Sequence, residues 1–201
     1  KTNQNFKNKY NKENLFEEKF QKNLLLFVDE FSNYLDAEIA LDSFLLFMGL
    51  GYKVTVIDTL DSGRALISKG FLKEAKEEAN KNISYLKNKV SETIPLVGIE
   101  PSAILSFRDE YLRLADDKLA ADAISKNAFL VEEFLASEIQ KGAIAAAQFT
   151  SEAKNITIHS HCHQKSLSHQ KEPLDILNLP KNYDTTTISA AICLMSRIFC
   201  Y

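Results

Sequence analysis

The chain has 201 residues, of which 45% are hydrophobic and 25% charged, and its formal net charge is −3. This composition is typical of a globular domain. The lack of a basic surplus argues against nucleic-acid binding. No apolar run reaches the roughly 18 residues that a membrane-spanning helix needs.

The first residues and the cysteines bear on where the protein works. Residues 1–22 are rich in Lys, Asn and Glu with spaced aromatic side chains, and we expect a linker or a helical lead-in there. This segment lacks the apolar stretch of a secretory signal. Three cysteines are an odd number and do not make a disulfide framework. We therefore expect a reducing, cytoplasmic compartment.

The first predicted elements form a βαβ unit. Residues 23–30 are a short apolar run that ends in acids, which is the pattern of a buried parallel strand. Residues 36–51 carry apolar side chains at helical spacing, opened by Asp36 and closed by Gly49 and Gly51. Residues 52–58 alternate and are β-branched, so they predict the next strand. Strand, helix and strand in this order predict a parallel sheet.

The middle of the chain is predicted to be mainly helical. Glu and Lys lie three to four apart over residues 68–92, which favours one long amphipathic helix. A third strand follows over 93–102. Two further helices are predicted over 103–115 and 116–142, and a loop or short helix over 146–153.

The last quarter of the chain repeats the order of strand, polar turn, helix and strand. Its strands are predicted over 154–161 and 184–195, with a short helix over 175–180 between them. We therefore predict an α/β fold with two related βαβ halves, each a short parallel sheet flanked by helices. The halves would be 23–150, with a helical insert, and 151–201. Their polar turns would meet on one rim at the carboxyl ends of the strands, where such sheets bind ligands.

The richest chemistry lies in the stretch "HSHCHQK", which holds His159, His161, Cys162 and His163. Thiolate and imidazole are ligands of zinc, copper and iron–sulfur centres. The alternative is that the histidines only satisfy backbone groups at a strand end. Cys193, after the next predicted strand, is the obvious second ligand, with a buried small hydrophobe as its alternative.

Other polar residues at the predicted strand ends support such a rim. Asp29 and Glu30, at the end of the first strand, could orient an imidazole or Lys165, and a Ser-Gly-Arg turn offers a guanidinium for an anion. An ordinary cap, turn or surface ion pair is the alternative for each. The supporting residues are Asp29, Ser62, Gly63, Arg64, Glu100, Arg108, Gln164 and Lys165. No glycine-rich dinucleotide motif, phosphate-binding loop or nucleophile elbow is present, which argues against hydride transfer by this chain.

Several stretches together resemble the cysteine-rich CCG domain of FAD-linked, iron–sulfur oxidoreductases of the D-lactate dehydrogenase and glycolate oxidase type. They are "LFVDEFSNY", "SGRALISKGFLKEAK", "IPLVGIEPSAILSFRDEYLRL" and "IHSHCHQKSL". The chain is also similar to the CCG subunit of heterodisulfide reductase. The resemblance runs from about residue 23 to the end.

The resemblance implies an electron-transfer role through an iron–sulfur cluster of the 4Fe–4S type, with Cys162 and Cys193 as ligands. It implies no catalytic residue in this chain. FAD and the oxidation of a D-2-hydroxy acid would belong to a flavin domain, and further clusters to ferredoxin-type domains or subunits. A quinone or cytochrome would accept the electrons, with a peripheral place at the inner face of the membrane.

The chain departs from the CCG pattern at both of its cysteine-rich turns. Asp61-Ser62-Gly63 stands where many members have Cys-Cys-Gly, and Ile192 replaces the first of the paired cysteines before Cys193. The glycines expected around Cys193, which permit close backbone approach to a cluster, are also missing. We therefore expect a degenerate site. Because the family continues past Tyr201, we also expect that the chain is truncated. Two alternatives stay open: a non-catalytic docking domain, and a mononuclear zinc or iron site built from Cys162 and the three nearby histidines.

Overall fold

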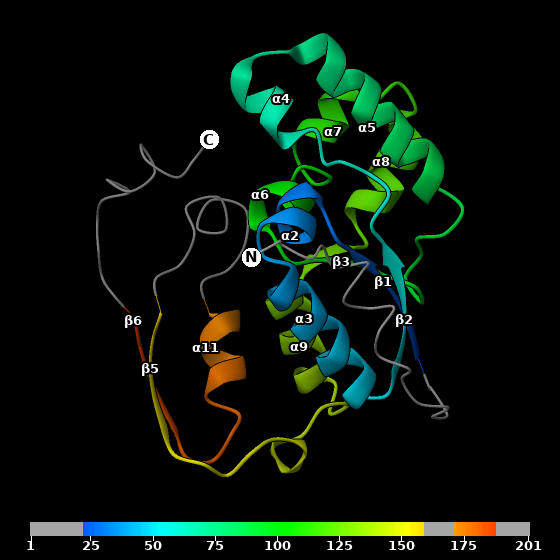
Figure 1. The fold of residues 1–201 in the computed structure, drawn as a ribbon. Helices are drawn as coiled ribbons and strands as arrows, with labels where there is room; N and C mark the ends of the chain where they lie inside the picture. The colour runs from blue at the N-terminus through cyan, green and yellow to red at the C-terminus, as the bar shows by residue number, and fades with distance from the viewer. Residues whose placement is uncertain (1–21, 159–170, 188–201) are drawn as a thin grey trace. The chain divides into compact units, whose positions relative to one another are not determined.

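The computed structural model describes residues 22–158 and 171–187 (Figure 1). The chain falls into two compact units, Lys1–Val131 and Glu132–Tyr201. Each unit is described by itself below. The predicted halves 23–150 and 151–201 stay a prediction.

The first unit is built on a four-stranded parallel sheet with the order β2-β1-β3-β4. Its strands are β1 (Lys22–Phe27), β2 (Tyr52–Ile57), β3 (Leu96–Gly98) and β4 (Ala128–Leu130). Leu25 of β1 lies opposite both Thr55 of β2 and Leu96 of β3. The chain runs outward from β1 to β2 and then crosses to β3 on the other side of β1. The direction of winding therefore reverses between β1 and β3.

Residues 24–27 are all buried, as expected for a central strand covered on both faces. Phe27 packs edge-on against Phe107, and Phe107 packs against Tyr111, with ring centroids 5.4 and 4.6 Å apart. A Cβ added at Gly98 would lie 2.5 Å from the Cβ of Ile104, so β3 needs glycine there. These contacts form a dense core directly below the carboxyl ends of the strands.

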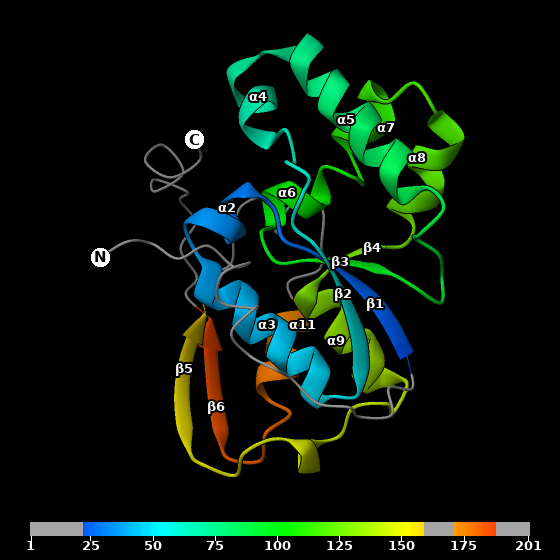
Figure 2. The same cartoon turned by 45° about the vertical axis from the view of Figure 1, so that its right-hand side comes forward.

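Seven helices complete the described part of the first unit. They are α2 (Glu30–Tyr34), α3 (Ala37–Gly49), α4 (Arg64–Lys69), α5 (Leu72–Leu86), α6 (Pro101–Leu105), α7 (Glu110–Leu114) and α8 (Lys118–Ser125). Figures 1 and 2 show α4, α5, α7 and α8 gathered beyond the carboxyl ends of the strands, on the same side as α2 and α6. Two ion pairs join α5 and the residue directly after it to the segment before α8: Lys76 to Asp116 at 2.6 Å and Lys87 to Asp117 at 3.4 Å.

The described part of the second unit holds a two-stranded parallel sheet. Its elements are α9 (Val131–Gln140), the 3-10 helix η1 (Ala146–Gln148), β5 (Lys154–Ile158), α11 (Glu172–Leu177) and β6 (Tyr183–Thr187). Lys154 lies opposite Tyr183, and the hydroxyls of Thr157 and Thr186 are 3.2 Å apart. The predicted order of strand, helix and parallel strand is confirmed here.

The α/β class, the short parallel strands and the flanking helices are confirmed, but three predicted helices are wrong. The helix predicted over 103–115 is two short helices, α6 and α7, with a turn over 106–109 between them. The helix predicted over 68–92 is two helices, because Gly70 at φ 79° ends α4 with a backbone N–H bond to Ile67. The helix predicted over 116–142 is α8, β4 and α9. Pairing with β3 outweighs the helical spacing over Ala128–Leu130.

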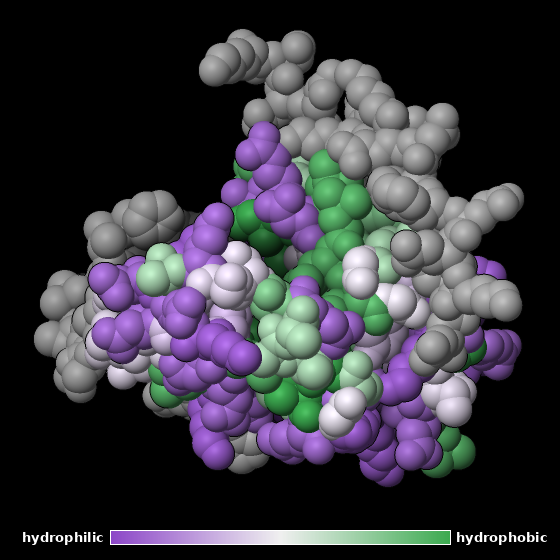
Figure 3. All heavy atoms as spheres, turned by 90° about the horizontal axis from the view of Figure 1, so that it is seen from below, coloured by the Kyte–Doolittle hydropathy of each residue, from purple (hydrophilic) through white to green (hydrophobic). Residues whose placement is uncertain are grey.

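None of the helices in residues 22–158 and 171–187 is long and apolar enough to cross a membrane. On the face drawn in Figure 3, hydrophilic and hydrophobic residues lie side by side. α5, with 15 residues, is the longest described helix, and its exposed side is dominated by Lys and Glu.

Candidate functional site

Polar side chains from three neighbouring segments lie at the carboxyl edge of the four-stranded sheet. Asp29 and Glu30 follow β1, Ser62 follows β2, and Glu100 follows β3. In open parallel sheets, ligands bind at this edge, where the winding of the chain reverses. Here that point lies between β1 and β3. The predicted convergence of "VDEFSN", "LDSGR" and "GIEPS" is therefore met within the first unit.

Asp29 is the N-cap of α2. Its Oδ1 accepts hydrogen bonds from the backbone N–H groups of Phe31 and Ser32, at 2.8 and 3.1 Å, and its Oδ2 accepts from the Ser32 hydroxyl at 2.8 Å. The residue is only 1% exposed. Burial, helped by the charge of Glu100, raises the pKa of this carboxyl to about 6 against the opposing effect of the hydrogen bonds from Ser32 and Phe31. In the described residues Asp29 thus acts as a helix cap, and its predicted role toward an imidazole or Lys165 stays a prediction.

Glu30 reaches from the start of α2 to the loop between β2 and α4. One carboxylate oxygen accepts from the backbone N–H of Ser62 and the other from its hydroxyl, both at 2.7 Å. The Ser62 Oγ in turn accepts from the N–H of Arg64 at 3.1 Å. This two-point contact fixes the position and the rotation of the loop backbone at Ser62.

Tyr111 of α7 holds the same loop from the other side. Its hydroxyl donates to the Ser62 carbonyl at 2.7 Å and accepts from Nδ2 of Asn82 at 3.0 Å, while Asn82 also donates to the Asp61 carbonyl. Burial first, and the charges of Glu30 and Glu78 next, raise the pKa of Tyr111 far above its usual range. The phenol therefore stays protonated and remains a hydrogen-bond donor.

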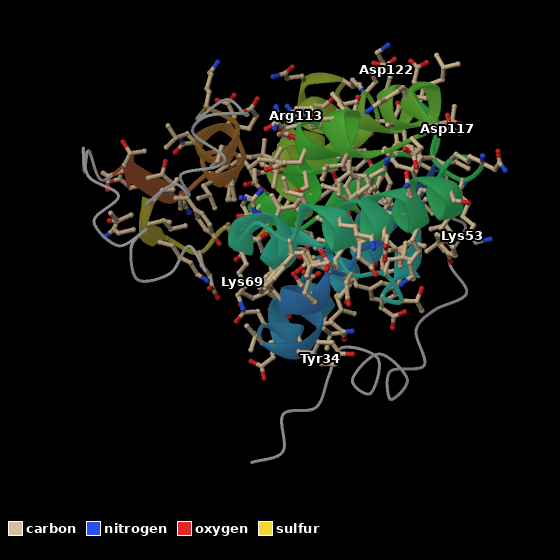
Figure 4. The ribbon with its side chains drawn as sticks, turned by 90° about the horizontal axis from the view of Figure 1, so that it is seen from above. Tyr34, Lys53, Lys69, Arg113, Asp117 and Asp122 are labelled. Atoms are coloured by element: carbon tan, nitrogen blue, oxygen red, sulfur yellow. The ribbon has the colours of Figure 1, made fainter. Side chains whose placement is uncertain are left out.

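The Ser-Gly-Arg turn adopts the tight geometry expected from its glycine. Gly63 has φ 65°, and a Cβ there would lie 3.3 Å from the Cβ of Glu78. The guanidinium of Arg64, the predicted anion fork, is paired with Glu110 of α7. Figure 4 looks down on this layer, with Lys69 at the end of α4, Asp117 at the start of α8 and Asp122 within α8, all at the outside of the molecule.

Glu100 is the N-cap of α6, which starts at Pro101. Its Oε2 accepts from the N–H of Ala103 at 2.6 Å. Arg108 lies between α6 and α7, and its backbone N–H donates to the Leu105 carbonyl at 2.9 Å. The structure thus brings Asp29, Ser62 and Glu100 to one edge and places Arg108 after α6.

The rest of the predicted site lies outside the described residues: His159, His161, Cys162, His163, Gln164, Lys165 and Cys193. Every cysteine and histidine of the chain lies outside the described residues, in 159–170 or 188–201. Within residues 22–158 and 171–187 no group of three potential ligands could hold a metal ion. That finding concerns only carboxylates, so the predicted metal centre stays a prediction.

At the described edge, the carboxylates of Asp29, Glu30 and Glu100 each accept hydrogen bonds from N–H or O–H donors. Iron–sulfur clusters take thiolate ligands, and such oxygen groups are no substitute for them. Any cluster would therefore depend on the cysteines and histidines beyond the described ranges. Sequence reasoning placed Glu30 at this edge beside Asp29 but did not find its contact with Ser62, and it did not assign Asn82 or Tyr111 to the edge. The partners of these side chains are 21 to 49 residues away, so no local pattern reveals the contacts.

Comparison with known proteins finds three similar bacterial enzymes. D-2-hydroxyglutarate dehydrogenase of Haemophilus influenzae is 35% identical over 100 residues, which are 49% of this chain and 10% of that protein. Proteins of the same name from Escherichia coli and Pantoea ananatis are 31% and 29% identical over 133 and 129 residues, which are 66% and 64% of this chain and 13% and 12% of those proteins.

The chain thus spans about a tenth of the length of the curated relatives it matches. No family model matches it, and no solved structure matches it. The similarity links the chain to dehydrogenases of a D-2-hydroxy acid, in agreement with the chemistry expected from the sequence.

Proposed function

We propose that this chain is the electron-transfer module of a flavin-dependent D-2-hydroxy-acid dehydrogenase, and that it works through an iron–sulfur cluster. The similarity to D-2-hydroxyglutarate dehydrogenases carries the proposal. Two sequence observations support the same proposal: the "HSHCHQK" stretch and the resemblance to CCG domains. The similarity is also consistent with an FAD-linked oxidoreductase family. The α/β fold, with polar turns at one sheet edge, supports it further.

Cys162 and Cys193 are the proposed cluster ligands, with His159, His161 and His163 as further ligands or neighbours. Thiolates are the donors that such clusters need. When bound, the cluster would accept and pass on single electrons. The described sheet edge would support the site structurally, because Asp29 and Glu100 cap the helices that begin there.

The substrate and the partners follow from the same proposal. The relatives are named for D-2-hydroxyglutarate, whereas the sequence resemblance suggested D-lactate or glycolate. A D-2-hydroxy acid is the chemistry they share, and its oxidation is assigned to a flavin domain. The partners would be flavin-binding and ferredoxin-type domains or subunits, with a quinone or cytochrome as acceptor. The place of action would be the cytoplasm, at or near the inner face of the membrane.

The test is the iron and acid-labile sulfide content of the chain, purified without oxygen and reconstituted. The proposal predicts iron and sulfide in equal amounts, about four of each per chain for a 4Fe–4S cluster. Cys162→Ser should abolish both, while Ser166→Ala, a change nearby that removes no ligand, should leave both unchanged. A folded chain that binds neither iron nor sulfide would overturn the proposal.

Ile192 favours a second candidate, a docking domain that kept the fold and lost the cluster. An aliphatic side chain cannot ligate iron, and it stands beside Cys193 where the CCG pattern has a cysteine. This candidate predicts a folded protein without metal. A mononuclear site at Cys162 and the histidines predicts one zinc or iron without sulfide, so the same measurement separates all three.

A further inference from the structure

Ser62, in the loop 58–63 between β2 and α4, is held at every polar atom. Its N–H and its hydroxyl donate to Glu30, its Oγ also accepts from Arg64, and its carbonyl accepts from Tyr111. The residue is fully buried, although it sits in a loop at the sheet edge. Loops at such an edge are usually exposed and adaptable, and this one is fixed instead.

The groups that hold the loop come from three other elements. Glu30 belongs to α2, Asn82 to α5 and Tyr111 to α7. Tyr111 is itself fixed by the aromatic packing described above. Glu30 brings a carboxylate to Ser62 through two hydrogen bonds. Hydrogen bonds to an ionised group are shorter and stronger than neutral ones, which agrees with the two distances of 2.7 Å.

The position of Ser62 decides what the loop presents at the edge. Asp61, directly before it, is exposed, and Gly63, directly after it, turns the chain into α4 at positive φ. In the CCG pattern these three positions are the cysteine-rich turn of the first half. In this chain the three positions carry no cysteine, and the loop is held by the carboxylate of Glu30.

We propose that Glu30 is a positioning residue, which holds loop 58–63 in the conformation that the candidate site uses. The carboxylate holds the loop through its charge and the hydrogen bonds to its two oxygens, and not by filling space. The inference rests on the proposed function only in assigning the loop to an electron-transfer site.

Amide hydrogen exchange on the whole chain tests this inference. Glu30→Gln keeps the shape of the side chain and removes its charge, and we expect about ten- to a hundredfold faster exchange at residues 61–64. Glu30→Asp, which restores the charge on a shorter side chain, should recover part of the protection. The matched control, Glu74→Gln at an exposed acid in the first turn of α5, should change nothing at the loop.

Two results would overturn the inference: wild-type exchange in Glu30→Gln, or equal acceleration at the loop and at β1. If the Glu30 variants do not fold, Ser62→Ala removes the hydroxyl from the other side of the contact and should loosen the same residues. The iron and sulfide measurement keeps the two proposals apart. A metal-free wild type would overturn the proposed function alone, and an iron-loaded protein with unchanged exchange in Glu30→Gln would overturn this inference alone.

Discussion

The hydroxyl of Tyr111 connects α7 to the loop before α4, and its removal tests the packing of the candidate site. Tyr111→Phe keeps the ring against Phe107 but deletes the O–H that donates to the Ser62 carbonyl at 2.7 Å. A buried carbonyl deprived of its donor costs about 1–3 kcal/mol. We therefore expect the free energy of unfolding to fall by that amount. The melting temperature should fall by about 2–4 °C for each kcal/mol in a chain of this size.

Urea unfolding followed by circular dichroism, with calorimetry for the melting temperature, measures this change. The matched control is Tyr34→Phe, because Tyr34 at the end of α2 is 58% exposed and lies at the outside of the molecule in Figure 4. A surface change of this kind should stay within about 0.5 kcal/mol of wild type. If Tyr111→Phe also stays within that limit, the hydroxyl does not hold Ser62 and the reasoning is refuted.

Two further predictions concern the same unit. Gly98→Ala places a Cβ 2.5 Å from the Cβ of Ile104 and should cost about 1–3 kcal/mol of stability in urea unfolding, whereas Gly49→Ala meets nothing within 4 Å and should be neutral or slightly stabilising. Equal effects of the two changes would show that β3 tolerates a side chain. The pKa of Asp29 is raised to about 6, so the folded state binds more protons than the unfolded state between about pH 4 and 6, and stability is lost as the pH rises through that range. Asp29→Asn lacks this dependence, and its free energy of unfolding should gain up to about 3 kcal/mol on wild type between pH 4 and 7. A pH-independent difference between the two proteins would contradict the raised pKa.

The sequence predicts the strands of the first unit where local pattern and burial agree. The apolar run at 23–30 and the alternating run at 52–58 correspond to β1 and β2, because each pattern is long enough to predict a strand. β4 has only three residues, Ala128–Leu130, and lies between two helical patterns. Its existence depends on pairing with β3, which no local pattern records.

The candidate site is predicted in part for the same reason. The place of Asp29, Ser62 and Glu100 follows from the rule that ligands bind at the carboxyl ends of parallel strands. The contacts of Glu30 and Tyr111 with Ser62 span 32 and 49 residues, and they depend on how α2 and α7 pack. Such contacts are set by tertiary packing, so the residues that fix the loop emerge only from the structure.

Transfer of electrons through this chain is the central claim, and turnover together with the proposed flavin domain tests it most directly. The measurement compares wild type and Cys162→Ser, without oxygen, each assembled with that proposed domain. We expect D-2-hydroxyglutarate to reduce the flavin equally fast in both proteins, and a quinone acceptor to be reduced only by wild type. Equal quinone reduction by the two proteins would show that electrons do not pass through Cys162, and it would contradict the account.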